Sequence, residues 1–424
     1  MGIVRATIAA ADAGHLVSRS FSTTSVRALL RDAAAVDVIA AGKASGPMLR
    51  AFNAECGVAI RRAVAVGMDR PGELVPNARW YAARHPIPDE GSVRAARAAL
   101  DVAGSATGRD LVVVLLSGGA SSLLALPAEG LTLEDKQATI TALLMAGADI
   151  GDLNVVRKHL SGIKGGRLAA ACSARMLTLA VSDVIGDDPS LIGSGPTVGD
   201  PSTFQMAEDV LRRFGGPGRY PPRVTRFLAR GTAGEIAESP RRGDGRLACS
   251  TAAIIGGCAD ALEGASLAAR SMGYSVRVIA EAVQGEARTA AIAYLASARR
   301  LLAEAPRPLC VLSAGETTVH VTGGGRGGRN QEFALAMATG LRGLHPGVVV
   351  ASVGTDGVDG PTDAAGAIVD TTTAQRARDA GLGDPQRYLD NNDSYDFFLG
   401  LGDLIQTGPT ATNVGDIQIM LIAE

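Results

Sequence analysis

The sequence predicts an α/β protein built from two successive α/β domains, and three observations carry this prediction. The chain has 424 residues, which at about 150 residues per domain suggests two or three domains. Short β-branched runs alternate with Ala- and Leu-rich stretches at helical spacing, which is typical of parallel strands covered by helices. This rhythm fades between residues 215 and 246, where Gly, Pro and charged residues dominate. In the first half, the expected strands are 36–41, 111–116 and 176–181, and the expected helices are 91–102 and 132–146.

The same alternation returns after the irregular stretch. The expected strands there are 275–280, 309–313, 317–321, 348–353 and 417–421, and the expected helices are 251–272 and 286–305. We therefore place the two domains at residues 1–240 and 241–424. Ligands of open α/β sheets bind in the crevice at the carboxyl ends of the strands, so the loops that follow the strands are where chemistry is expected.

Composition excludes several classes of function. The chain carries 41 Lys and Arg against 43 Asp and Glu, so its charge gives no reason to expect nucleic acid or a membrane surface as partner. Its five cysteines include no CxxC pair, which indicates neither a zinc site nor a disulfide framework, and the cytoplasm is the expected compartment. The uncharged run 111–128 is interrupted by Ser and Gly and does not have the pattern of a membrane span.

Two loops of the first half have the composition of anion-binding turns. Lys43 follows the strand 36–41 and precedes an expected helix, so its charge and the free backbone N–H groups suit a phosphate. The Walker A pattern is not met, and a surface lysine on a tight turn is the alternative. The loop 117–122 follows the strand 111–116, and its glycines and hydroxyls suit an oxyanion, although a structural turn explains the glycines equally well.

Two charged segments follow along the chain. Residues 157–167 contain four cations and His159, which indicates an anion site; the alternative is a solvated helix face, and His159 is expected to be structural. Three aspartates come after the strand 176–181, at 183, 187 and 188. Carboxylates at a strand end suit Mg²⁺, while helix capping and turn formation are the alternative.

The second half adds three further loops. Residues 323–328 satisfy the GxGxxG pattern literally, but no acidic residue follows about 20 residues later, so the dinucleotide signal is weak. The loop 354–362 carries Asp356 and Asp359, and the loop 407–413 ends in Asn413.

Taken in order along the chain, these loops resemble class II glycerate kinases, the glycerate 2-kinases whose C-terminal part is the MOFRL domain. The residues that carry the resemblance are 42–45, 116–122, 157–161, 164–167, 182–189, 327–332, 354–357, 359–362 and 407–413. They extend over nearly the whole chain.

The resemblance implies an N-terminal Rossmann-like domain with a doubly wound parallel sheet, a C-terminal MOFRL α/β domain, and an active-site cleft between them. It implies transfer of the γ-phosphoryl group of ATP to the C2 hydroxyl of D-glycerate, with Mg²⁺, giving 2-phosphoglycerate and ADP. Members of this family are often labelled hydroxypyruvate reductases, so an NAD(P)H-dependent reductase is the alternative, supported only by the 323–328 run. A non-catalytic anion-binding protein is a third hypothesis.

The same resemblance assigns the candidate site residues. The family's important lysine and arginine match Lys43 and Arg329, which would supply positive charge to the migrating phosphoryl group. The candidates for binding substrate or phosphate are Ser45, Ser117, Gly118, Gly119, Ser121, Arg157, Lys164, Asp356, Asp359 and Asn413. Asp183, Asp187 and Asp188 would hold Mg²⁺ or orient the C2 hydroxyl. A homodimer is compatible with the sequence, which contains nothing that decides the oligomeric state.

Overall fold

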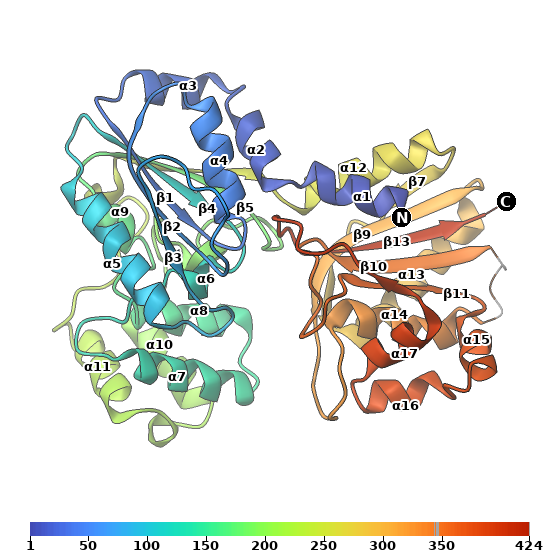
Figure 1. Ribbon diagram of the computed structural model, residues 1–424. Helices are drawn as coiled ribbons and strands as arrows, with labels where there is room; N and C mark the ends of the chain where they lie inside the picture. The colour runs from blue at the N-terminus through green and yellow to red at the C-terminus, as the bar shows by residue number, and fades with distance from the viewer. Residues whose placement is uncertain (343, 345–346, 424) are drawn as a thin grey trace. The chain divides into compact units, whose positions relative to one another are not determined.

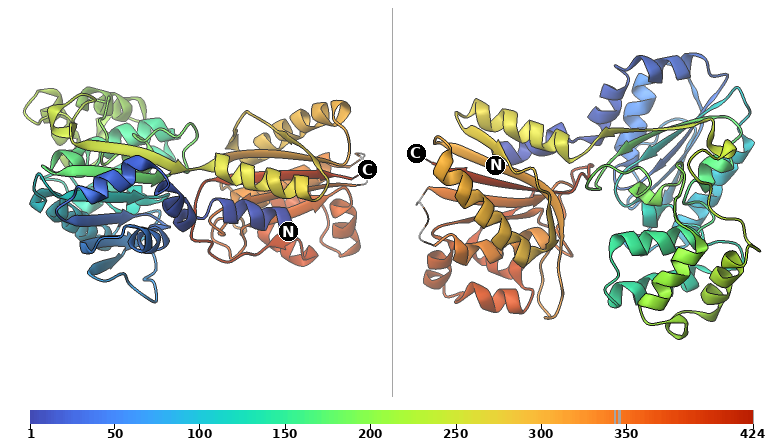
Figure 2. Two further views of the ribbon diagram at one scale, coloured as in Figure 1. Left: turned by 90° about the horizontal axis from the view of Figure 1, so that it is seen from above. Right: turned by 180° about the vertical axis from the view of Figure 1, so that it is seen from behind.

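The computed structural model describes residues 1–342, 344 and 347–423 and shows two compact units. The first unit is Ala13–Ile255, and the second joins Met1–Asp12 to Gly256–Glu424. Two features therefore differ from the division at residue 240 that the sequence predicts. Strand β6 (Ser250–Gly256) extends the sheet of the first unit, and helix α1 (Gly2–Ala10) packs along α12 (Cys258–Ser271) in the second, as both panels of Figure 2 show.

The sheet of the first unit has the strand order β3-β2-β1-β4-β5-β6. Its remaining strands are β1 (Val36–Ala41), β2 (Ile60–Gly67), β3 (Ala78–Ala82), β4 (Leu111–Leu116) and β5 (Arg175–Val181). The pairings that join β1 to β5 are all parallel. This is the strand order of the Rossmann fold, in which the direction of winding reverses between β1 and β4. The predicted doubly wound parallel sheet is confirmed.

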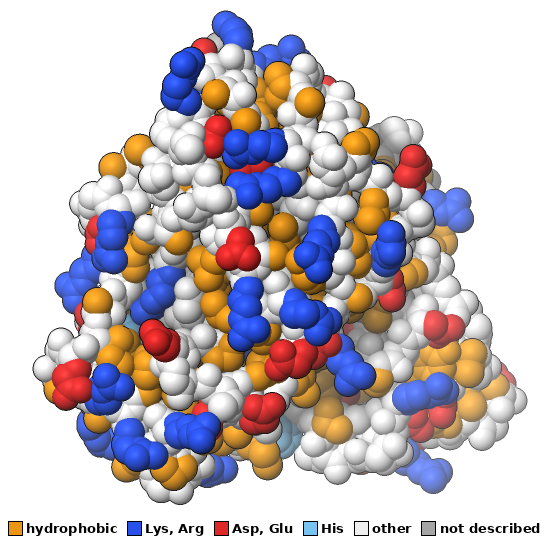
Figure 3. Space-filling model, turned by 60° about the vertical axis from the view of Figure 1, so that its left-hand side comes forward, with side chains coloured by type: hydrophobic (Ala, Val, Ile, Leu, Met, Phe, Trp, Pro, Cys, Tyr) orange, Lys and Arg blue, Asp and Glu red, His pale blue; other side chains and the backbone are white. Residues whose placement is uncertain are grey.

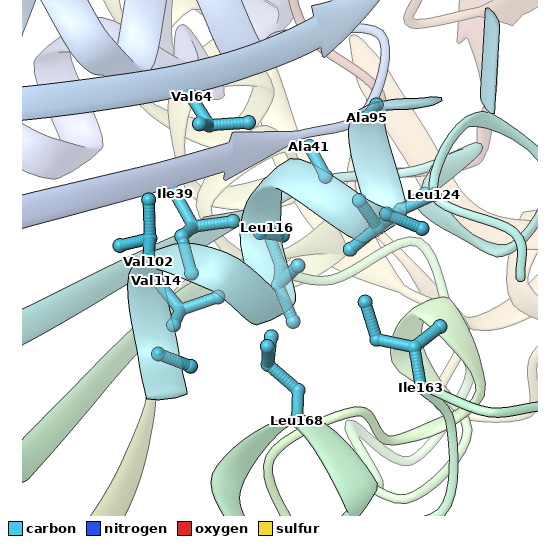
Figure 4. Close-up of a cluster of buried hydrophobic side chains, with 14 of the residues drawn as sticks. Ile39, Ala41, Val64, Ala95, Val102, Val114, Leu116, Leu124, Ile163 and Leu168 are labelled. Carbon is cyan, nitrogen blue, oxygen red and sulfur yellow. The ribbon is translucent and has the colours of Figure 1, made fainter. Parts of the chain in front are cut away.

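Helices cover both faces of this sheet, because alternate strand residues point to opposite sides. On one face, Ile39 and Val114 pack against Val102 of α5 (Glu90–Ser105), as Figure 4 shows. The short helices α6 (Ala120–Leu123) and α9 (Arg167–Ala170) complete that layer. Helix α4 (Ser45–Glu55) lies against β1 and β2 and contacts α2 (Ala13–Ser20), beside α3 (Thr24–Arg31) (Figure 1). The first unit therefore has three layers, with the sheet between two layers of helices.

Four helices of the first unit form a separate bundle with its own core. They are α7 (Leu133–Met145), α8 (Ile150–His159), α10 (Phe204–Arg213) and α11 (Pro222–Thr232). Helix α11 lies within the stretch 215–246, where the sequence predicts an irregular connection, so this expectation was wrong. Val224, Phe227 and Leu228 have helical spacing and are buried in the bundle. The prolines and glycines around them obscure that short pattern.

The second unit has a mixed sheet of order β12-β11-β10-β13-β9-β7, and β8 pairs with β9. Its strands are β7 (Ser275–Val278), β8 (Val283–Glu286), β9 (Leu309–Thr318), β10 (Val348–Gly354), β11 (Gly366–Asp370), β12 (Leu404–Ile405) and β13 (Asp416–Ile422). Strand β13 runs antiparallel to both β9 and β10, whereas β7 and β8 run parallel to β9.

Helices α13 (Ala287–Glu304) and α14 (Arg329–Gly340) pack on the sheet of the second unit through a core that includes Tyr294 and Phe333, whose rings are 5.7 Å apart. Helices α15 (Thr373–Asp379), α16 (Pro385–Asp390) and α17 (Ser394–Leu401) follow (Figure 1). The α/β class predicted for this half is confirmed.

Two expected elements of the second half are wrong in detail. One strand, β9, replaces the two expected at 309–313 and 317–321. The helix expected to begin at residue 251 begins at Cys258, because the apolar run before the Gly256-Gly257 pair forms β6. A short apolar run of this kind has no periodicity that separates a buried strand from a helix.

The surface agrees with the balanced composition. On the face drawn in Figure 3, Lys and Arg side chains are interspersed with Asp and Glu. No helix among the described residues has the length and apolar character needed to cross a lipid bilayer.

Candidate functional site

The loops that follow β1 and β4 meet at the switch point of the first sheet. The Lys43 N–H donates a hydrogen bond to the Gly118 carbonyl at 2.9 Å, and the Ala44 N–H donates one to Ser117 Oγ at 3.0 Å. Gly42 has φ +129°, and a Cβ there would lie 2.1 Å from Ser117 Oγ, so this position requires glycine. The structure thus brings together residues that the sequence singles out 73 positions apart.

Two side chains lie against Gly119, beside this junction. It has φ +82°, and a Cβ there would lie 3.3 Å from Lys43 Cγ and 3.1 Å from His85 Cδ2. The lysine stem and the imidazole therefore both lie against the glycine. Sequence reasoning missed His85, because it comes shortly after β3, a strand that the apolar pattern does not reveal.

The predicted hydroxyl groups hold the loops in place. Ser45 is buried and its Oγ donates to the Val66 carbonyl at 2.8 Å, while the buried Ser117 accepts from Ala44. Ser121 Oγ lies 2.8 Å from Ser194 Oγ, which donates to Asn154 Oδ1 at 2.9 Å. The backbone at the ends of β1 and β4 is thereby fixed before any ligand arrives.

The cationic segment 157–167 is largely inside the protein. Lys158 and Lys164 are buried, which excludes a solvated helix face for these two residues. Lys158 pairs with Asp200 at 3.2 Å, and Lys164 Nζ donates to the Gly193 carbonyl at 3.1 Å. His159 is structural, as predicted: its Nδ1 lies 2.8 Å from the Val155 carbonyl and its Nε2 lies 3.2 Å from Glu238.

The three aspartates after β5 occupy different environments. Asp183 is partly buried at the carboxyl end of β5, whereas Asp187 and Asp188 lie on an exposed turn in which Asp188 Oδ1 accepts from the Ser190 N–H at 2.8 Å. No group of three His, Cys, Asp or Glu side chains among the described residues is arranged to hold a metal ion. Mg²⁺ takes one or two carboxylates and completes its shell with phosphate oxygens and water, so Asp183 fits a substrate-borne Mg²⁺.

In the second unit, carboxylates fix Arg329 at the first position of α14. Its Nε lies 2.6 Å from Asp416 Oδ2, its Nη2 3.0 Å from Asp416 Oδ1, and its Nη1 2.7 Å from Glu316 Oε1. Burial opposes the charge of Arg329, but the two carboxylates outweigh it and raise the pKa of the guanidinium. Sequence reasoning missed Glu316 and Asp416, because only their position as acids in otherwise apolar strands marks them.

Asp359 occupies the amino end of the same helix. It accepts from the Asn330 N–H at 3.0 Å and the Gln331 N–H at 2.8 Å. Burial raises the pKa of Asp359 to about 7, and neighbouring Asp416 adds to the shift, although these two N–H groups and Arg329 oppose it. A Cβ at Gly328 would lie 2.3 Å from Asp359 Cγ, so glycine permits this approach.

The loops after β10 and before β13 are joined in the same way. Thr355 Oγ1 donates to the Gly415 carbonyl at 2.7 Å, and the Thr410 N–H donates to the Asp356 carbonyl at 3.2 Å. The segments that carry Asp356 and Asn413 therefore lie side by side, and Asn413 is buried.

The glycine run 323–328 is packed against protein backbone. The Thr322 and Gly323 N–H groups donate to Asn392 Oδ1 at 2.8 and 2.9 Å, and a Cβ at Gly323 would lie 2.3 Å from the Asn391 carbonyl oxygen. At the helix that follows, Asp359 takes the N–H groups that a dinucleotide phosphate would need. The interpretation of this run as a dinucleotide-binding loop is wrong.

The first unit is thus of the Rossmann-like class, with a lysine loop and a glycine loop at its switch point, and the second is an α/β unit that fixes an arginine at a helix start. Family models match both: residues 1–229 match a domain of unknown function (DUF4147), and residues 309–416 match the MOFRL family. The chain belongs to the glycerate kinase family.

Relatives of known name support this membership. The chain is 40% identical to the D-glycerate 2-kinase of Thermotoga maritima, over 91% of this chain and 90% of that protein. It is 42% identical to an Agrobacterium vitis protein named "Putative hydroxypyruvate reductase", over 91% and 86%. The crystal structure of Thermotoga maritima glycerate kinase superposes with a TM-score of 0.85 at 37% identity, covering 99% of this chain and 98% of that one.

Proposed function

We propose that this protein is a glycerate 2-kinase that transfers the γ-phosphoryl group of ATP to the C2 hydroxyl of D-glycerate, giving 2-phosphoglycerate and ADP. The observation that carries the proposal is the 40% identity to a D-glycerate 2-kinase across nine tenths of both chains. The alternative of an NAD(P)H-dependent reductase loses its only structural support, since Asp359 occupies the N–H groups at the start of the helix that follows the 323–328 run.

Lys43 is the cation of the first unit in this proposal. Phosphoryl transfer needs alignment of the reactants and positive charge around the migrating group. The backbone of Lys43 is fixed by Gly118 and its stem is steadied by Gly119, so the ammonium group is presented from a rigid loop at the carboxyl end of β1. A charge held in advance needs little reorganisation during the reaction.

Arg329 is the cation of the second unit. Its paired contact with Asp416 and its bond to Glu316 orient the planar guanidinium. Such two-point pairing sets the direction of a guanidinium more firmly than a single contact could. Asp416, Glu316 and Asp359 are positioning residues that act through Arg329 or through the helix it begins.

Magnesium is part of the proposal through the donor set of the loop after β5. Asp183 would hold the ion, and Asp187 and Asp188 are the further carboxylates of that loop. When bound, Mg²⁺ supplies positive charge to the phosphate oxygens of ATP. The residues Ser121, Asp356 and Asn413 remain proposed contacts of the substrates.

The test compares two activities of the same purified protein. With D-glycerate, ATP and Mg²⁺, we expect ADP formation that depends on glycerate; with hydroxypyruvate and NADH or NADPH, we expect no oxidation of the nicotinamide. The absence of glycerate-dependent ADP formation, together with oxidation of the nicotinamide, would contradict the proposal.

A further inference from the structure

Three cationic side chains, those of Lys136, Arg157 and Lys164, interact electrostatically inside the first unit, and two of them are almost fully enclosed. Lys136 of α7 is 3% exposed and Lys164 of the loop after α8 is 1% exposed. Lys136 Nζ donates to the carbonyl groups of Arg157 and Leu160 at 3.1 and 3.4 Å. Lys164 Nζ donates to the carbonyl groups of Gly193 and Leu124 at 3.1 and 3.4 Å. Carbonyl groups accept hydrogen bonds but carry no net charge that could balance an ammonium.

The charged neighbours of these lysines are all positive. Arg157 and Arg167 act on Lys136, and Lys136 and Arg157 act on Lys164. Burial, reinforced by these like charges, lowers the pKa of Lys136 to about 7 and lowers that of Lys164 as well. Within the described residues, no Asp or Glu forms an ion pair with Lys136, Arg157 or Lys164.

The acids closest to this group are already engaged. Asp200 and Glu238 act on Arg167, a fourth cation that interacts with Lys136, but Asp200 pairs with Lys158 and Glu238 contacts His159. Enclosing several like charges without a counter-charge is strongly unfavourable. On the face drawn in Figure 3, by contrast, cations and acids are intermixed. An anion supplied by a ligand is the missing counter-charge that this arrangement accepts.

The cations lie beside the switch-point loops of the same unit. A Cβ at Gly193, whose carbonyl accepts from Lys164, would lie 3.2 Å from Ala120 Cβ, so the Gly193 loop packs on the helix that directly follows Ser117 to Gly119. Ser121 and Ser194 bridge the two segments at 2.8 Å.

Of these three cations, Arg157 is the one that a ligand can contact, because both lysines are buried and Arg157 is not. The residue is partly exposed, its guanidinium has no hydrogen bond to any described residue, and burial lowers its pKa. A planar guanidinium suits the two oxygens of a carboxylate. One partly exposed arginine that interacts with two enclosed ammonium groups suits a single small anion better than a chain of phosphates.

We infer that Lys136, Arg157 and Lys164 form the subsite that binds the carboxylate of a small 2-hydroxy acid. The inference rests on the proposed function and deepens it, because it assigns the group that distinguishes glycerate from uncharged polyols. Arg157 contacts the carboxylate, and the two enclosed lysines are positioning residues whose positive charge is stabilised when the anion binds. Lys136 was not foreseen from the sequence.

Steady-state kinetics of charge-removing variants test this subsite. For Arg157→Gln we expect the KM for D-glycerate to rise by about 10- to 100-fold, the usual effect of losing a charge-assisted hydrogen bond. The KM for ATP should change less than about twofold, and Arg157→Lys should recover part of the loss. Arg212→Gln, which removes an exposed arginine of α10, is the matched control and should leave both constants unchanged. A rise confined to the KM for ATP would overturn the inference, since the cations would then bind a nucleotide phosphate.

Calorimetric titration with D-glycerate alone gives a readout that does not depend on turnover. At pH 8, Lys136 is mostly deprotonated in the free protein, and a bound carboxylate raises its pKa, so binding should take up protons. The heats in Tris and in HEPES should differ accordingly, and Lys136→Met should reduce the difference. Binding with proton uptake but no phosphorylation would refute the proposed function and leave the subsite standing. Phosphorylation with an unaltered KM for glycerate in folded Arg157→Gln would refute the subsite alone.

Discussion

Replacing Lys136 by Met should change the stability of the first unit in a pH-dependent way, most favourably at low pH and less favourably as the pH rises. The methionine keeps an unbranched side chain of similar length at this 3% exposed position but removes the ammonium. The pKa of Lys136 lies at about 7, against an ordinary value of 10.5. A difference of this size corresponds to about 5 kcal/mol of destabilisation for the charged form in the folded protein.

The sign of the pH dependence follows from proton counting. Below pH 7 the lysine is protonated in both states, so its burial destabilises the fold in full. Between pH 7 and 10.5 the unfolded chain binds a proton that the folded protein does not, so the stability of the parent protein rises with pH. At pH 9.5 about 3 kcal/mol of the destabilisation has disappeared.

Comparing the stability change of the variant at two pH values isolates the contribution of the lysine charge. Lys136→Met also leaves the carbonyl groups of Arg157 and Leu160 without their partner, which costs about 1–3 kcal/mol each at every pH. We therefore expect the stability change of the variant to become less favourable by about 3 kcal/mol between pH 6 and pH 9.5.

Urea unfolding at a series of pH values measures this change. Trp80, the only tryptophan of the chain, lies on β3 of the first unit, so its fluorescence follows the relevant unit. As a control, Lys158→Met removes a buried lysine that is paired with Asp200 and should destabilise the protein at every pH. A stability change for Lys136→Met that stays constant from pH 6 to 9.5 would refute the reasoning.

Three further predictions concern residues of the candidate site, in the loops that follow the strands and at the start of α14. Lys43→Ala and Arg329→Ala should each lower kcat by roughly 10²- to 10³-fold, as for loss of one electrostatic contact to the transition state. The melting temperature should change little for Lys43→Ala but fall for Arg329→Ala, which leaves the buried Asp416 without its cationic partner. Near-normal kcat in both variants would leave them structural. Gly42→Ala should lower stability and activity together in thermal melts and rate assays, because its Cβ would overlap Ser117 at a φ of +129°. Asp359→Asn should flatten the pH dependence of unfolding between pH 4 and 7, since a carboxyl whose pKa is raised to about 7 binds a proton in the folded state and loses stability as pH rises through that range; an unchanged slope would contradict this.

The sequence predicted best those parts of the fold that are buried on both faces. Strands β1 and β4 were expected with the bounds they have, because a parallel strand enclosed by helices is one continuous apolar run. Strand β2 was missed since Arg61 and Arg62 interrupt its pattern. Both arginines pair with the buried Asp37, at 2.6 and 2.8 Å, and this contact exists only in the folded sheet.

The candidate site residues also differ in how well the sequence reveals them. Lys43 and the Ser117 loop could be found because each follows a recognisable strand, and their meeting at the switch point follows from the strand order. Lys136 could not be found in this way, because nothing in the sequence of α7 marks one lysine as enclosed. Asp416 and Glu316 were missed for a similar reason: their role is defined by Arg329, which is 87 and 13 residues away along the chain.

The position of the phosphate in the product tests the proposed activity most directly. Phosphorus NMR of a reaction with D-glycerate, ATP and Mg²⁺ distinguishes phosphate on the C2 oxygen from phosphate on the C3 oxygen. The account predicts 2-phosphoglycerate as the single new phosphoester, formed together with ADP and absent when EDTA removes the metal. A product dominated by 3-phosphoglycerate, or a rate unaffected by EDTA, would contradict it.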